Sequence, residues 1–179
     1  SPLLGIAGAF AILQVLTHLK ISQKTWSQKF YKGAQLFSAG ALSVTHGMND
    51  AQKTMGIITL ALYAGGWAQG HLAVPLWVKL TCAVVMGLGT AVGGWRIIKT
   101  LGYGITKLRP MDGFAAESAS ATVIGLASHW GMPVSTTHTV TSAVVGTGLV
   151  HPEQPLHMGV VKNILKTWVF TFPATIGIA

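Results

Sequence analysis

The chain has 179 residues, of which 50% are apolar and 9% are charged, whereas roughly 25% of residues are charged in an average soluble domain. The formal net charge is +8, but eight of the twelve Lys and Arg residues are grouped in two connections, on either side of a stretch that holds neither. This alternation is typical of a membrane protein with both basic connections in the cytoplasm. The low charge content and the long apolar stretches exclude a soluble domain, and no aromatic motif accompanies the basic residues to indicate nucleic-acid binding. The groups are Lys20, Lys24, Lys29 and Lys32, and Arg96, Lys99, Lys107 and Arg109, on either side of residues 67–75.

The first half of the chain reads as two apolar stretches around a polar connection. Residues 2–16 are expected to end a membrane span, and residues 17–33 form a basic cytoplasmic connection. Residues 34–66 are largely apolar but too long for one straight span of about 20 residues. Polar residues interrupt this stretch at 45–50. We therefore expect a helix that is broken near its middle, where the backbone would line a cavity.

The middle of the chain contains a second kind of membrane segment. Residues 76–95 carry a single charge and are expected to cross the membrane. Within 113–150, two apolar pieces of 17 and 16 residues flank a Gly/Pro turn. Each piece would be about 25 Å long as a helix, short of the roughly 30 Å hydrocarbon layer. This favours a re-entrant helical hairpin, although two tilted spans joined by a tight outer turn fit as well.

A last span is expected at 160–179, so that residues 1–179 form one transmembrane domain. The predicted fold class is therefore an all-α membrane protein, a helix bundle with a broken helix and a re-entrant hairpin. Because the sequence opens and closes within apolar runs, we expect it to be part of a longer protein.

Two acidic residues stand within these apolar stretches. Asp50 follows Asn49 and precedes Lys53 by one helical turn, and an ionisable residue at membrane depth indicates a functional site. A structural Asp50–Lys53 ion pair is the alternative. Glu117, with Ser118 beside it, offers hard oxygen ligands for Na⁺ or a group that binds a proton. Its alternative role is that of an acid favoured by the helix dipole.

Three consecutive hydroxyl residues, Ser135, Thr136 and Thr137, follow a proline and are expected to open a helix. A helix N-terminus with unpaired N–H groups is a favourable place for an anion, although simple N-capping would also explain one hydroxyl. His46 and His138 each neighbour a candidate site and are possible accessory residues. The histidines, the acids and the single cysteine show no metal-ligand spacing, and no catalytic residue is predicted.

The two polar segments together resemble the signatures of the inorganic phosphate transporter (PiT) family. Segment 46–53, His-Gly-Met-Asn-Asp-Ala-Gln-Lys, is similar to the Asn-Asp signature of that family's second half. Segment 117–121, followed by Pro-Val-Ser-Thr-Thr-His at 133–138, is similar to its other signature. The resemblance extends over nearly the whole stretch from residue 34 to residue 150. Where many family members have Asn-Asp-x-Ala-Asn, this chain ends the motif in Gln52 and Lys53, so Lys53 could supply positive charge for an anion.

The resemblance implies one half of an inverted-repeat transporter, with the missing N-terminal repeat completing a central site. It implies phosphate-binding roles for Asn49, Ser135, Thr136 and Thr137, and cation-coupling roles for Asp50, Glu117 and Ser118. The implied activity is uptake of inorganic phosphate coupled to Na⁺ or H⁺, with phosphate sometimes carried as a metal complex and with no cofactor. The implied setting is a bacterial inner membrane, in contact with lipid, and a homodimer and a monomer both stay open as the assembly.

Other functions remain open at this point. Another oxyanion such as sulfate is the nearest alternative substrate, because a helix N-terminus does not distinguish the two anions. An intramembrane enzyme would need a nucleophile or a metal held by a further residue, and the sequence offers none. A passive channel fits an enclosed site on broken helices less well than alternating access does.

Overall fold

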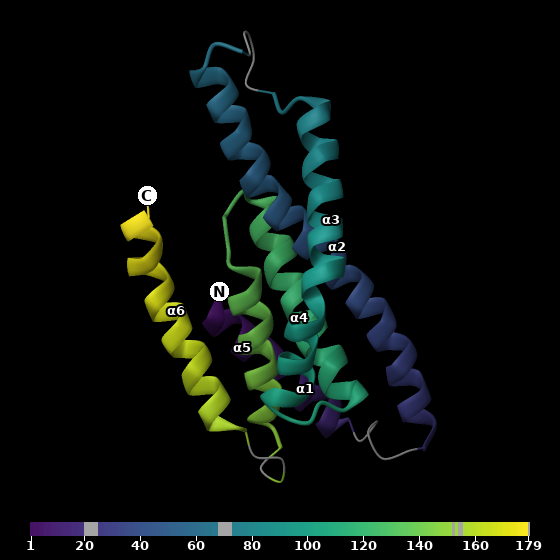
Figure 1. The fold of residues 1–179 in the computed structure, drawn as a ribbon. Coiled ribbons are helices and arrows are strands. Elements are labelled where there is room, and N and C mark those ends of the chain that lie inside the picture. The colour runs from purple at the N-terminus through teal and green to yellow at the C-terminus, as the bar shows by residue number, and fades with distance from the viewer. Residues whose placement is uncertain (20–24, 68–72, 152, 154–155, 179) are drawn as a thin grey trace.

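The computed structural model describes residues 1–19, 25–67, 73–151, 153 and 156–178, and within them every regular element is helical (Figure 1). The prediction of an all-α fold is thus confirmed for the described residues. The elements in chain order are α1 (Pro2–His18), α2 (Thr25–Ala64), α3 (Leu76–Lys99), a π-helical turn η2 (Thr100–Gly104), α4 (Pro110–His129), α5 (Thr136–Gly148) and α6 (Met158–Ile178).

The predicted break in the helix at residues 34–66 is wrong. Helix α2 runs for 40 residues and passes through 45–50 without interruption. The polar side chains do not compete with the helix here, because Thr45 bonds back to the carbonyl of Ala41 and Asp50 pairs with side chains one turn away. Gly47 lowers helix propensity by only about 1 kcal/mol, and α2 contains no proline to remove a backbone hydrogen bond.

The basic connection is shorter than the predicted 17–33. Helix α1 continues to His18 and α2 has begun by Thr25, so residues 25–33 are helical. Lys20 and Lys24 lie outside the described residues. The same holds for 68–72 in the predicted outer loop between α2 and α3.

Helices α4 and α5 are antiparallel neighbours joined by residues 130–135, and their boundaries follow from local sequence. Pro110 occupies the first turn of α4, and Asp112 accepts a hydrogen bond from the backbone N–H of the N-cap residue Arg109. At the other end Gly131 has a φ of +67°, and the N–H of Met132 reaches back to the carbonyl of Ala127. This left-handed glycine cap reverses the chain so that α5 returns along α4.

Small residues allow α1 to lie against α5, while α2 lies along α4. A Cβ on Gly146 would stand 2.5 Å from the carbonyl oxygen of Ile6, and one on Gly5 would stand 2.6 Å from that of Thr139. Close backbone approach of this kind is how helices associate where lipid supplies no hydrophobic drive. Mostly small apolar side chains of α1, α4 and α5, together with Ile105 after η2, form a buried core: Ala9, Ile105, Ala116, Ala119, Ala143 and Val144.

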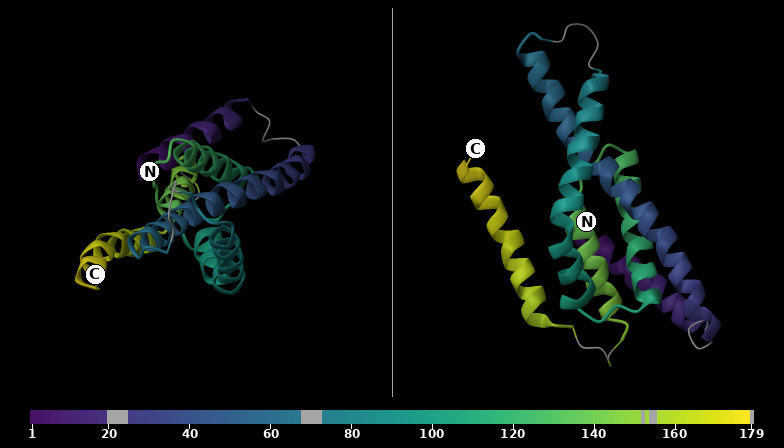
Figure 2. Two further views of the ribbon diagram at one scale, coloured as in Figure 1. Left: turned by 90° about the horizontal axis from the view of Figure 1, so that it is seen from above. Right: turned by 45° about the vertical axis from the view of Figure 1, so that its right-hand side comes forward.

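Helices α3 and α6 lie at the outside of this group (Figure 2). Among the described residues, one segment, Leu76–Trp95 of α3, is long and apolar enough to cross a membrane by length and composition. It coincides with the span predicted at 76–95, and most of its large apolar side chains are exposed. Helix α2 was expected to be a broken membrane helix and α6 to be the last span. Neither is apolar enough over a membrane-spanning length to meet the same description. Both carry lysines and many hydroxyl or amide residues, which lower their mean hydropathy.

Candidate functional site

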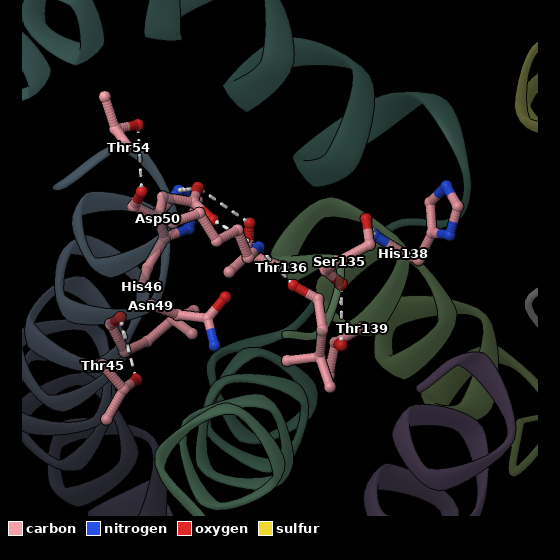
Figure 3. A network of polar contacts seen from close by, with 12 residues as sticks. Thr45, His46, Asn49, Asp50, Thr54, Ser135, Thr136, His138 and Thr139 are labelled. Carbon is pink, nitrogen blue, oxygen red and sulfur yellow. Dashed lines mark hydrogen bonds and ion pairs between the residues drawn. The ribbon is translucent and has the colours of Figure 1, made fainter. Parts of the chain in front are cut away.

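Asp50 is the centre of a polar network that joins α2 to the start of α5 (Figure 3). Its carboxylate lies 3.1 Å from the Nε2 atom of His46 and 3.1 Å from the Nζ atom of Lys53, each one turn away on α2. The hydroxyl of Thr136 donates to the same carboxylate over 3.1 Å. The structure thus brings together two segments that lie 86 residues apart in sequence. The predicted Asp50–Lys53 pair is present, but it is one contact among several.

Lys53 makes a second contact that the sequence did not indicate. Its ammonium donates to the carbonyl oxygen of Val134 over 2.5 Å, just before α5 begins. Asp50 and Lys53 form one side of an open cavity of about 410 Å³, and the other side consists of residues 133–137. The cavity is therefore bounded by one acidic, one basic and three hydroxyl side chains.

The hydroxyl residues at the start of α5 have different roles. The side chain of Ser135 caps the helix, because its Oγ accepts the N–H of His138 over 3.3 Å. Thr136 is 4% exposed, and Thr137 is exposed on the cavity wall. The N–H groups of Thr136 and Thr137 belong to the first turn and have no intrahelical acceptor. The capping interpretation is thus confirmed for Ser135. All three hydroxyl residues line the cavity, and their role in binding an anion stays a prediction.

Asn49 faces away from this cavity and towards α4. Its Nδ2 atom donates to the hydroxyl of Ser128 over 2.9 Å, and the side chain is 2% exposed. Its Oδ1 atom is buried without a hydrogen-bond partner among the described residues. A buried, unpaired amide oxygen is costly, so a donor or a cation at this position would stabilise the fold. No feature of the sequence singled out Ser128 as the partner.

Glu117 of α4 forms a second polar site, which lies between α4 and α2. The hydroxyl of Ser38 donates to its Oε2 atom over 2.5 Å, and the amide of Gln35 donates to Oε1 over 3.4 Å. Ser38 lies 12 residues before Asp50 on the unbroken helix, which corresponds to about 18 Å. Ser118 is half-buried beside Glu117. The predicted cation-coupling residues therefore lie in two separate places: Asp50 of α2 lines the cavity, whereas Glu117 and Ser118 lie on α4.

The two candidate histidines, His46 and His138, also lie in different surroundings. His46 belongs to the Asp50 network, but the ring of His138 points away from it (Figure 3). That ring lies against Trp168 of α6, with centroids 4.0 Å apart. His138 therefore contacts α6 with its side chain and takes part in the α5 cap with its backbone.

A charged cluster at the opposite end of the α4–α5 pair was missed by sequence reasoning. The Nε of Arg109 donates to Asp112 over 3.1 Å, and Nε2 of His151 lies 3.2 Å from the same carboxylate and against the guanidinium. Nδ1 of His151 lies 3.2 Å from Glu153. Asp112 is 2% exposed. The only local signal was the Pro-x-Asp sequence that starts α4.

Comparison with known proteins bears directly on this arrangement. The sequence profile of the phosphate transporter family matches residues 1–179. A "Probable low-affinity inorganic phosphate transporter" of Rhizobium meliloti is 41% identical over 175 residues, which is 97% of this chain and 52% of that protein. A relative of the same description from Bacillus subtilis is 40% identical over 180 residues, covering 99% and 54%.

A solved structure described as "The sodium-dependent phosphate transporter" shares this fold. It has a TM-score of 0.72 and 26% identity, covering 95% of this chain and 51% of that one. The chain spans about half the length of the relatives it matches. These matches confirm the family resemblance noted in the sequence, and membership of this family implies a membrane protein. This chain belongs to the phosphate transporter family.

Proposed function

We propose that this chain forms one half of a secondary transporter that moves inorganic phosphate across a membrane together with Na⁺ or H⁺. Its relatives are described as phosphate transporters, and the chain accounts for about half of each. The remaining half would be a repeat of inverted topology that supplies the other wall of the site. The α4–α5 pair would be a re-entrant hairpin with residues 130–135 at membrane depth, and the membrane would be a bacterial inner membrane.

The observation that carries this proposal is the cavity between Asp50, Lys53 and residues 133–137. Phosphate carries between one and two negative charges near neutral pH, and burying it without donors is prohibitive. Hydroxyls at 135–137, the first-turn N–H groups of α5 and the Lys53 ammonium supply such donors. A helix N-terminus adds the favourable end of the dipole. This combination suits a tetrahedral oxyanion.

Thr136 links the binding of phosphate to the state of Asp50. Its single hydroxyl hydrogen is donated to Asp50 in the structure described here. To donate to phosphate it must leave Asp50, which then loses one of its partners. Phosphate binding is therefore coupled to a change in the environment of Asp50, which a positive charge beside its carboxylate would offset. Asn49 would act next to the cavity rather than as a direct wall of it.

Glu117 and Ser118 are proposed to form the second cation-coupling position. Two donors, Ser38 and Gln35, hold the carboxylate of Glu117 in place from α2. Carboxylate and hydroxyl oxygens suit Na⁺, and a carboxyl group can equally carry a proton. Because Glu117 contacts α2 about 18 Å from Asp50, an ion at Glu117 would not touch the phosphate.

Uptake by the full-length protein in proteoliposomes tests the function. We expect radiolabelled phosphate uptake that saturates, that depends on an imposed Na⁺ or H⁺ gradient, and that excess sulfate does not inhibit. Competition by sulfate at equal concentration would identify a general oxyanion transporter. Uptake that neither saturates nor responds to either gradient would contradict secondary transport. Adding and omitting Mg²⁺ shows whether phosphate is carried as a metal complex.

A further inference from the structure

Lys53 occupies an unusual position in the cavity, between two oxygen atoms from different elements. Its Nζ atom lies 3.1 Å from Oδ1 of Asp50 and 2.5 Å from the carbonyl oxygen of Val134. The first oxygen belongs to α2 and the second to the segment that leads into α5. The ammonium thus bridges the two walls of the cavity at the place where they meet.

These two oxygens are of the kind that bind a hard monovalent or divalent cation. Carboxylate and main-chain carbonyl oxygens are the usual protein ligands of such ions. The ammonium of a lysine is itself a compact, strongly hydrated point charge. It can satisfy the same oxygens with its hydrogens, but it is tethered to α2 and cannot be released to the other side of the membrane.

We propose that the Lys53 ammonium takes the position beside Asp50 that a transported cation would otherwise fill. This repeat then binds phosphate without taking up an ion at Asp50. The inference rests on the proposed function, because it assumes that the cavity is the phosphate site. It reassigns Asp50 from a ligand of a transported cation to the partner of a fixed charge, and it leaves Glu117 as the position in this half that exchanges an ion.

The charges at the cavity wall support this reading. Asp50 and Lys53 together are neutral, so an arriving phosphate meets no net repulsion from α2. Without the ammonium, Asp50 would leave one uncompensated negative charge beside a dianionic or monoanionic substrate. That charge attracts a cation from solution, and binding of phosphate and of that cation then become linked. His46 is the other basic group on this carboxylate.

The linkage can be measured as a slope. Phosphate binding to the purified full-length protein is titrated at several Na⁺ concentrations, with choline keeping the ionic strength constant. The slope of log affinity against log[Na⁺] counts the Na⁺ ions taken up with each phosphate. The titration is carried out at the same pH for the wild type and every variant. Subtracting the slope of the wild type from that of a variant removes the contribution of Na⁺ ions bound by the other repeat.

The decisive variant is Lys53→Asn, which removes the ammonium and leaves a side chain too short to reach Val134. We expect its slope to exceed that of the wild type by about one, so that each tenfold fall in Na⁺ weakens its phosphate affinity about tenfold more than it weakens the wild type's. Lys53→Arg keeps a positive charge and should keep the wild-type slope. Lys162→Asn, which removes an exposed lysine of α6, controls for net charge.

Each result has a defined meaning. An equal slope for Lys53→Asn and wild type overturns the inference, as does a slope raised to the same extent in Lys162→Asn. If the asparagine variant is not recovered as a folded protein, Lys53→Gln replaces it with the same expectation. Failure of the wild type to bind or transport phosphate would instead refute the proposed function, so the two failures are distinguishable.

Discussion

Replacing Gly146 by alanine tests whether α1 and α5 are held together by backbone contact. The added Cβ would lie 2.5 Å from the carbonyl oxygen of Ile6 and 2.9 Å from its Cα atom. Real Cβ atoms essentially never approach other atoms so closely, and the neighbours are backbone, which cannot rotate away. The helices must separate locally. Overpacking of a close contact costs typically 1–3 kcal/mol, and we expect Gly146→Ala to destabilise the full-length protein by that amount.

Gly33 provides the matched control, because a Cβ at this helical position meets nothing within 4 Å. Alanine there is expected to be neutral or to stabilise by up to about 1 kcal/mol through helix propensity. The assay is thermal unfolding of both variants in the same detergent. Gly5→Ala should destabilise too, and the double variant should lose less than the sum of the two because α1 moves only once. Equal melting temperatures for Gly146→Ala and Gly33→Ala would refute the close-packing argument.

Three further predictions concern the sites. Thr136→Ala should weaken phosphate binding about 10- to 100-fold, since it removes a hydrogen bond to a charged group worth about 1.5–3 kcal/mol; unchanged affinity in equilibrium dialysis would remove Thr136 from the anion site. Glu117→Gln should abolish gradient-driven uptake while the protein still inserts, and retained coupled uptake would reduce Glu117 to a structural acid. If α4 and α5 form a re-entrant hairpin, an impermeant thiol reagent should label a single cysteine at exposed Lys107 from one side, whereas a cysteine at Met132, exposed in the turn, should not be labelled from the opposite side. Labelling of Met132→Cys from that opposite side would instead indicate two full spans.

Local signals predicted the turn between α4 and α5. The Gly/Pro turn was expected to separate two helices at 130–134, and α4 ends at His129 while α5 begins at Thr136. The start of α4 was placed at residue 113, whereas the helix begins at Pro110. The meeting of the Asn-Asp segment with the Ser-Thr-Thr segment was expected from the family resemblance rather than from spacing. The structure places Asp50 against Thr136, as that resemblance implied.

The errors have a common physical cause, which is that polar residues were interpreted by composition rather than by partner. Residues 45–50 suggested a break, yet their side chains bond within α2 or to its neighbours, so the helix continues. Ser38, Gln35 and Ser128 became relevant only once α2 and α4 were seen side by side. Their contacts depend on the rotation of one helix against the other, and no local pattern encodes that rotation.

Because α2 is one continuous helix, a tilt at one point along it displaces the residues at its other points. Ser38 holds Glu117 at one point of this rigid helix, and Asp50 meets Thr136 at another, about 18 Å further along. A tilt of about 10° around Ser38 displaces Asp50 by about 3 Å. That displacement is as long as the hydrogen bonds that Asp50 and Lys53 make across the cavity, so it breaks them. A small rotation at the Glu117 end would thus separate α2 from the start of α5, with no hinge inside the helix.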